Sequence, residues 1–139
     1  MSNYDTDLYE WTKEQAEALR RRAANELDWD NLAEEIESLG NSNRRELRSR
    51  IEVLILHLLN WKYQPERQSG GWRGSIREAR DRLEDLLNES PSLRGRLPEY
   101  LPKAYARARE KALDETGLYR LPDSCPWTIE EILAHDFLP

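Results

Sequence analysis

Residues 47–61 read LRSRIEVLILHLLNW and form the most apolar helix-length stretch of the chain. Their apolar side chains recur at the spacing of one helix face, and this stripe comprises Leu47, Ile51, Leu54, Leu58 and Trp61. One polar side chain, His57, interrupts the most apolar part of the stretch. In a continuous helix Arg50, His57 and Gln64 repeat at i, i+7 and i+14, so they form one polar line beside the stripe. The stretch therefore predicts a long central helix, near residues 43–63, with a polar seam.

The size and composition of the chain indicate one folded domain. Its 139 residues suffice for a single hydrophobic core. Charged residues make up 35% and hydrophobic residues 38%, which is polar for a globular protein, but five Trp and six Tyr supply apolar area that disordered chains lack. We therefore expect residues 1–139 to fold as a single domain.

The sequence gives no sign of membrane, disulfide or metal chemistry. No apolar run approaches the roughly 18 residues that span a bilayer, and the acidic start, MSNYDTDLYEW, does not resemble a signal peptide. Cys125 is the single cysteine, so it forms no disulfide within the chain, and no Cys and His cluster has the spacing of a zinc site. We expect a cytoplasmic protein that contacts no membrane and binds no metal or cofactor.

The net charge of −6 is unevenly distributed along the chain. Residues 1–43 contain 4 basic and 11 acidic side chains, residues 44–109 contain 15 and 9, and residues 110–139 contain 2 and 7. The favoured interpretation is that the acidic ends pair with the basic middle inside one molecule. The alternative is an RNA- or DNA-binding bundle, which requires one exposed basic face built from Arg44, Arg45, Arg48 and residues 73–82. Nucleic acid is not the favoured partner, because an acidic chain is poorly steered towards phosphate.

Five or six helices are predicted, and no strand. Thr12 and Gln15 form a capping box for a first helix that runs to about Leu27. A second helix begins near residues 28–30 and ends at Gly40, a typical helix stop. We expect its apolar face to point inward, and this face comprises Trp29, Leu32, Ala33, Ile36 and Leu39.

The remaining helices follow from capping residues and prolines. Asn43 and Glu46 cap the central helix, which must stop before Pro65. Three further helices are expected, over about residues 72–88, from about residue 98 to Gly117, and from a capping box of Thr128 and Glu131 near the C-terminus. Together these signals predict an all-α, single-domain helical bundle.

His57 needs a partner if the bundle buries it, because buried polar groups are nearly always hydrogen-bonded. Glu35 projects towards the core boundary of the second predicted helix, and Arg80 falls in the apolar stripe of the fourth. We therefore predict a polar core network that joins three helices. Its members are Glu35, His57, Arg80, Arg73 and Gln64.

The same histidine also permits a catalytic interpretation. Arg50, six further residues and then His57 resemble the Arg and His pattern of HEPN-type ribonucleases, which are small all-α bundles. That resemblance implies an Arg50 that stabilises phosphate charge and a His57 that assists attack by a 2′-hydroxyl, without a metal ion. The two interpretations differ in one observable, since a catalytic His57 must open into a solvent cleft beside Arg50.

Aromatic and basic residues concentrate in the segment WKYQPERQSGGWR, residues 61–73. They form either a tight corner between helices, where rings and guanidinium groups stack, or an interaction surface rich in the residue types of binding hot spots. The candidate surface comprises Trp61, Tyr63, Arg67, Trp72 and Arg73.

Five sequence blocks, in the same order along nearly the whole chain, resemble a bacterial, often cyanobacterial, family known as domain of unknown function 29. These blocks are NLAEEIESLG (31–40), HLLNWKYQPE (57–66), WRGSIREAR (72–80), ESPSLRGRLP (89–98) and SCPWTIEEIL (124–133). The resemblance implies an all-helical bacterial domain and supplies no catalytic residue, ligand or partner. We therefore predict a non-enzymatic protein-binding or regulatory module, monomeric or homodimeric, with a metal-independent ribonuclease as the alternative.

Overall fold

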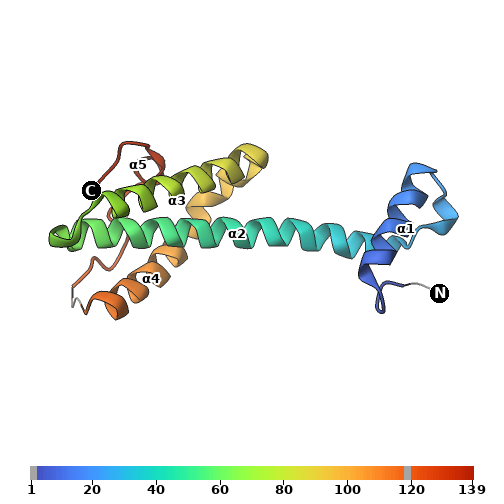
Figure 1. The fold of residues 1–139 in the computed structure, drawn as a ribbon, viewed down its shortest axis with the longest axis horizontal. Helices are drawn as coiled ribbons and strands as arrows, with labels where there is room; N and C mark the ends of the chain where they lie inside the picture. The colour runs from blue at the N-terminus through green and yellow to red at the C-terminus, as the bar shows by residue number, and fades with distance from the viewer. Residues whose placement is uncertain (1–2, 118–119) are drawn as a thin grey trace. The chain divides into compact units, whose positions relative to one another are not determined.

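The computed structural model describes residues 3–117 and 120–139, and within these ranges the chain is helical and contains no strand. Figure 1 shows the five α-helices of the described residues. Their bounds are Leu8–Arg20 for α1, Trp29–Tyr63 for α2, Gly70–Glu89 for α3, Leu97–Thr116 for α4 and Ile129–Leu133 for α5. This confirms the predicted all-α fold with a long helix. None of the helices described here is both long and apolar enough to cross a bilayer.

The chain divides into two compact units, Met1–Asn43 and Arg44–Pro139. In the first unit, α1 begins one turn earlier than predicted because Asp7, not Thr12, is its N-cap. The Asp7 carboxylate accepts a hydrogen bond from the backbone N–H of Glu10 at 3.0 Å, whereas the Thr12 hydroxyl donates to the carbonyl of Tyr9. Residue Arg22, with φ of 58°, ends the helix well before Leu27.

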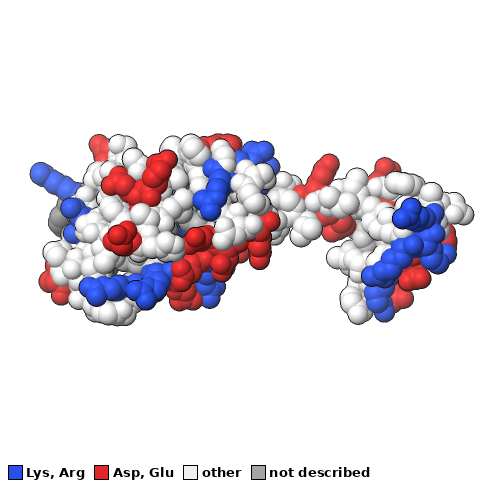
Figure 2. All heavy atoms as spheres, turned by 90° about the horizontal axis from the view of Figure 1, so that it is seen from above, with Lys and Arg blue, Asp and Glu red and all other residues white. Residues whose placement is uncertain are grey.

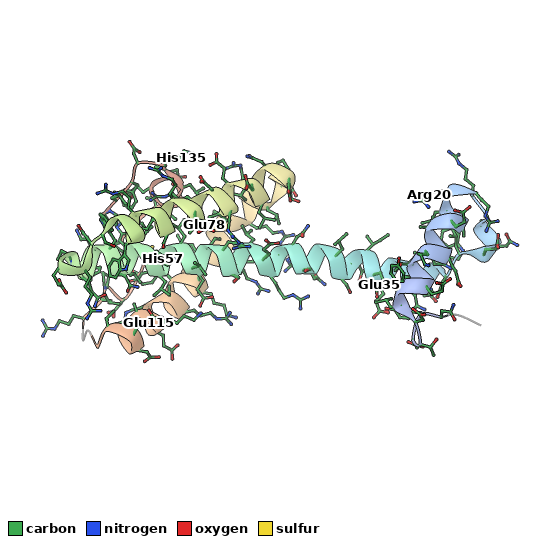
Figure 3. The ribbon with its side chains drawn as sticks, in the orientation of Figure 1. Arg20, Glu35, His57, Glu78, Glu115 and His135 are labelled. Atoms are coloured by element: carbon green, nitrogen blue, oxygen red, sulfur yellow. The ribbon has the colours of Figure 1, made fainter. Side chains whose placement is uncertain are left out.

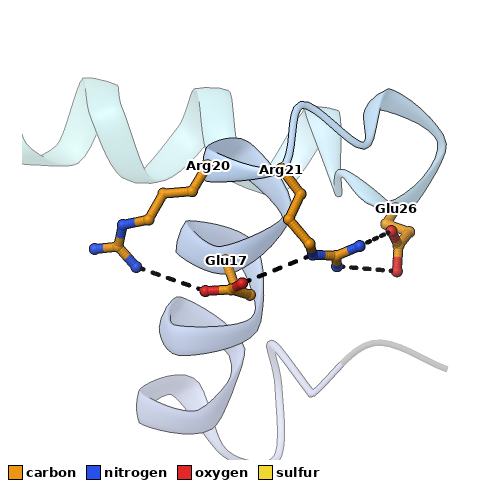
Figure 4. Close-up of polar contacts among 4 residues, drawn as sticks. All are labelled: Glu17, Arg20, Arg21 and Glu26. Carbon is orange, nitrogen blue, oxygen red and sulfur yellow. Dashed lines mark hydrogen bonds and ion pairs between the residues drawn. The ribbon is translucent and has the colours of Figure 1, made fainter.

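The turn after α1 is closed by ion pairs that Figure 4 shows. Both guanidinium nitrogens of Arg21 reach the Glu26 carboxylate, at 2.9 and 3.3 Å, and Glu17 contacts Arg20 and Arg21 at 3.9 and 3.8 Å. All four side chains are exposed, so water and salt screen these pairs. These ion pairs therefore favour one geometry of the turn and add little to the stability of the unit.

Gln15 and Trp11 fasten α1 to the beginning of α2. The Gln15 amide donates to the carbonyl of Glu26 at 3.3 Å and accepts from the backbone N–H of Asp28 at 2.7 Å. The Trp11 indole N–H donates to the Asp28 carboxylate at 3.1 Å. Because Trp11, Gln15 and Ala18 are buried, this small interior depends on side-chain hydrogen bonds as much as on apolar contact.

Helix α2 continues through Gly40, so the two helices predicted before and after that residue are one. Gly40 does not adopt the left-handed conformation of a helix stop, which among the described glycines only Gly117 does, with φ of 69°. A glycine inside a helix costs roughly 1 kcal/mol relative to alanine. The part of α2 that follows Gly40 is buried from Leu47 onward. The packing of this part outweighs the cost of the glycine.

The second unit holds the main core, and α2 supplies its largest share. The predicted stripe of α2 is confirmed, since Leu47, Ile51, Leu54, Leu58 and Trp61 are all buried. The side chains that complete the cluster from α3, α4 and the C-terminal segment include Ile76, Leu83, Leu87, Tyr105, Ala108, Trp127 and Ile132. Within this unit α3 and α4 lie along α2 on different sides (Figure 1).

Capping residues predicted from the sequence fix several ends of these helices. Gly117 ends α4 as predicted. Ser69, which the sequence did not single out as a cap, caps α3 by accepting from the backbone N–H of Trp72 at 3.2 Å. The Thr128 and Glu131 capping box is confirmed, with both reciprocal hydrogen bonds at 3.1 Å.

Candidate functional site

Arg50 and His57 line one pocket of about 210 Å³, between α2 and α3. Two members of the predicted polar line therefore open into one cavity, whereas the third, Gln64, is buried and does not line it. The other lining residues are Val53 from α2 and Ser75, Glu78, Ala79 and Arg82 from α3. Ser75 and Ala79, which have small side chains, line the pocket together with residues of α2, so the pocket depends on the sequence of both helices.

The His57 ring is half-buried, and burial lowers its pKa while the Glu115 carboxylate opposes that shift. Figure 3 labels His57 on α2, Glu78 on α3 and Glu115 on α4. Within residues 3–117 and 120–139 the ring has no hydrogen-bond partner. Its two nitrogens are also not among the fully buried atoms that lack a partner. The imidazole is thus neutral near pH 7, and its nitrogens are accessible from solvent.

The two arginines of this pocket are engaged by carboxylates of their own helices. The Arg50 guanidinium lies 3.5 Å from Glu46, and the Arg82 guanidinium lies 2.9 Å from Glu78. These are exposed i, i+4 pairs, which contribute only about 0.3–0.5 kcal/mol each. A phosphate group in the pocket can therefore compete for both guanidinium groups.

The predicted network of Glu35, His57 and Arg80 does not form. Glu35 and His57 belong to one helix, not two, and side chains of one helix meet only when three or four residues apart. In the first unit the Glu35 carboxylate accepts a hydrogen bond from the Tyr4 hydroxyl at 2.5 Å. The prediction failed because it depended on the helix stop at Gly40.

Arg80 has a structural partner that the sequence did not indicate. It is 3% exposed, and its guanidinium donates to the carbonyls of Ile132, His135 and Phe137 at 2.9, 3.3 and 2.5 Å. These carbonyls lie at and beyond the end of α5, where the helix leaves them without helical partners. Arg80 therefore binds the C-terminal segment to α3.

The corner between α2 and α3 is mainly a packed corner. Trp61 is buried, and its carbonyl accepts from the Gln68 amide at 2.8 Å. Tyr63 and Trp72 are half-buried against the core, and Gln64 is buried at the end of α2. The Arg73 guanidinium lies 5.7 Å from the centre of the Trp61 ring and, like Arg67, is exposed. A binding role for this corner stays a prediction.

The first unit exposes an apolar face that the sequence analysis assigned to the core. Trp29, Ile36 and Leu39 are 63%, 69% and 66% exposed, although their spacing with Leu32 is that of a buried helix stripe. Acidic side chains border this stripe, and residues 23–43 contain no Lys or Arg. In the view of Figure 2 the exposed stretch of α2 shows uncharged and acidic side chains. We call this set the acidic–apolar face, and it comprises Trp29, Leu32, Ile36 and Leu39 with Asp30, Glu35 and Glu37.

A group of three possible metal ligands lies on the second unit, where the sequence predicted none. The ligand atoms of Asp81, Glu84 and His135 all lie within 4.8 Å of one another, and the His135 ring is 3.0 Å from Glu84. Two of the three side chains are exposed. Exposed acidic groups of this kind occur commonly without an ion, so the geometry assigns them no metal.

The chain matches the model of a known protein family. The model of a family described as "Domain of unknown function DUF29" matches residues 3–138, which is nearly the whole chain. The resemblance seen in the five sequence blocks is thereby confirmed. Neither the curated proteins nor the solved structures contain a match.

Proposed function

The chain belongs to the DUF29 family, and we propose that it is a protein-binding module whose acidic–apolar face binds a basic amphipathic helix of a partner protein. One observation carries this proposal: Trp29, Ile36 and Leu39 are each more than half exposed on one face of α2. Soluble proteins rarely leave several large apolar side chains together in water unless they bind something. The proposal retains the binding role inferred from the sequence and moves it from the corner to this face.

The spacing of the apolar residues favours a helical partner. Trp29, Leu32, Ile36 and Leu39 follow intervals of three, four and three residues, which is the seam that a second helix packs against. Burying one large apolar side chain contributes about 1.5–3 kcal/mol. Because association itself costs at least about 4 kcal/mol, four such side chains leave a net of at most about 8 kcal/mol, which reaches the micromolar range only at this upper limit.

The acidic residues near the stripe indicate that the partner is positively charged. Glu35 borders the stripe on the side of Leu39, whereas Glu37 and Asp30 lie roughly a quarter turn beyond Trp29 on the other side. Residues 23–43 contain no basic side chain. Lysines or arginines that flank an apolar helix face would therefore meet carboxylates across the interface. A second copy that presents the same face would place acids opposite acids, so we favour a different, basic partner over self-association.

A synthetic 18-residue peptide of leucine and lysine, patterned as an amphipathic helix, tests the proposal by isothermal titration calorimetry. We expect one peptide per chain and a dissociation constant that rises at least tenfold in the Ile36→Asp variant. Leu138→Asp is the matched control, because it introduces the same charge at another exposed apolar residue. A scrambled peptide of equal charge separates apolar contact from simple attraction.

Three results would contradict the proposal. They are equal affinity for the scrambled peptide, equal loss of binding in Ile36→Asp and Leu138→Asp, and a concentration-dependent dimer that Ile36→Asp abolishes. The last result, seen by analytical ultracentrifugation, would make the face a contact between two copies.

A second candidate function is metal-independent RNA cleavage at the pocket of Arg50 and His57. It is supported by the observation that both side chains line one solvent-accessible cavity, which was the condition stated for catalysis. A neutral His57 can accept the proton of a 2′-hydroxyl, and Arg50 with Arg82 can stabilise the charged phosphate.

Cleavage of a single-stranded RNA in the presence of EDTA tests this second candidate. We expect His57→Ala and Arg50→Ala each to reduce cleavage at least a hundredfold, in line with the usual contribution of a general base. His135→Ala, which changes the other histidine of the chain, is the control. Cleavage that persists in His57→Ala would reject this site.

A further inference from the structure

Another pocket, of about 370 Å³, lies between α2 and α4 of the second unit. Four of its lining side chains are cationic, and Arg45 and Arg48 come from α2 while Lys103 and Arg107 come from α4. The other lining residues are Ser49, Glu52, Tyr100 and Ala104. We call the four cations the basic pocket set.

The basic pocket set has one acidic neighbour in the pocket lining, Glu52. Among the residues that the structure describes, none of the four cations takes part in an ion pair. The neighbouring acids are directed elsewhere: Glu46 pairs with Arg50 at 3.5 Å, Glu52 with Lys111 at 3.1 Å and Glu99 with Arg96 at 3.6 Å. Glu52 offsets one of the four charges, so an excess of positive charge in the pocket remains available to a ligand from outside the chain.

Gathering these cations has a cost in the free protein. Arg45 and Arg48 are three residues apart on α2, and Lys103 and Arg107 are four residues apart on α4, so each pair repels along its own helix. The pocket then brings the two pairs together. An anion bound among them removes this repulsion. Anion binding therefore explains why the four cations are clustered, whereas the stability of the fold does not.

Tyr100 gives the pocket a fixed wall. It is buried, its hydroxyl oxygen accepts a hydrogen bond from Arg44 Nε at 3.1 Å, and the Arg48 guanidinium lies 5.6 Å from the centre of its ring. These contacts restrain Arg48 before any ligand arrives, and preorganised groups bind with less loss of entropy. The Arg48 guanidinium therefore occupies one face of the Tyr100 ring.

We propose that the basic pocket set binds a compact ligand through two or three linked phosphate groups. Four cations and one acid, Glu52, leave three positive charges, which match the charge of a di- or triphosphate better than that of one phosphate. Guanidinium groups also pair with phosphate oxygens in a bidentate manner. The site is a concave pocket and not an extended stripe, which favours a small ligand over a polynucleotide. This inference does not rest on the protein-binding role, because it concerns different residues in the other unit.

Inorganic triphosphate, titrated by calorimetry, is the first probe. We expect one site per chain, affinity that weakens with added salt, and at least tenfold weaker binding of inorganic phosphate. The variant Arg45→Gln with Lys103→Gln should weaken triphosphate binding at least tenfold. Its matched control, Lys62→Gln with Arg77→Gln, removes the same charge from two exposed residues outside the pocket and should leave binding unchanged.

ATP is the second probe and distinguishes the source of the phosphates. Equal affinity for ATP and triphosphate supports a site that reads the phosphate chain alone, and tighter ATP binding supports a nucleotide site.

Absence of triphosphate binding at millimolar concentration overturns the proposal, as does equal weakening in both double variants. Tight binding of a 12-nucleotide RNA without triphosphate binding also overturns it, in favour of a nucleic-acid surface. Circular dichroism of both variants verifies that they are folded.

Discussion

Arg80→Met tests the structural role of the buried arginine of α3. Methionine keeps the aliphatic body of the side chain and removes the guanidinium, which donates to the carbonyls of Ile132, His135 and Phe137. It also removes the guanidinium that lies 5.9 Å from the centre of the Phe137 ring. The C-terminal segment thereby loses its polar attachment to α3.

The size of the effect follows from the environment of each bond. A hydrogen bond from a charged donor contributes about 1.5–3 kcal/mol, and a carbonyl left unpaired in the interior costs a similar amount. The bond to Ile132 is buried and those to His135 and Phe137 are part-buried, so they contribute unequally. Removing a buried cation returns part of its desolvation cost. We expect the free energy of unfolding to fall by about 3 kcal/mol.

Equilibrium unfolding in urea measures this loss, with protease sensitivity of residues 129–137 as a local readout. The control is Arg77→Met, one turn earlier on α3, where the side chain is exposed and the change should stay within about 0.5 kcal/mol. A loss below about 1 kcal/mol for Arg80→Met, or equal losses for both variants, would refute the role assigned to Arg80.

Three further predictions concern α2. Gly40→Ala should raise the free energy of unfolding by about 0.5–1 kcal/mol, because Gly40 is inside a helix and an added Cβ meets nothing within 4 Å. A decrease in the free energy of unfolding, measured in urea, would instead support the predicted helix stop at Gly40. Asn60→Leu should stabilise the fold by up to about 1 kcal/mol, since the buried Asn60 Oδ1 has no hydrogen-bond partner among the described residues, and an unchanged or lower urea midpoint would contradict this. Because burial lowers the pKa of His57, the unfolded chain binds more protons than the folded chain just below about pH 6.5. The melting temperature should therefore fall between pH 7.5 and 5.5 by more in the natural protein than in His57→Gln, and identical falls would show that His57 does not titrate differently on folding.

Local signals in the sequence predicted much of the fold. The stripe of residues 47–61 specified which side of α2 is buried, and Thr128 with Glu131 specified the beginning of α5. These succeed because a helix period and a capping box are properties of a few neighbouring residues. Gly40 misled for the same reason, since a local stop signal carries no information about the strength of the helix on either side.

The functional features depend on contacts that local patterns do not contain. The stripe of Trp29, Ile36 and Leu39 has the same period whether a helix packs into its own core or binds a partner, so amphipathicity alone assigned it to the core. The pocket beside His57 requires Ser75 and Ala79 of α3, and the basic pocket set requires Lys103 and Arg107 of α4. Only the packing of distant helices brings these residues together.

The indole N–H signals of the five tryptophans, followed by nuclear magnetic resonance, test the central claim most directly. Trp29 is exposed, whereas Trp11, Trp61 and Trp127 are buried. On titration with the basic amphipathic peptide, the Trp29 signal should shift until one equivalent is bound while the three buried indoles stay in place. A Trp29 signal that does not move at saturation, or a shift confined to Trp61 and Trp72, would contradict the assignment of binding to the acidic–apolar face.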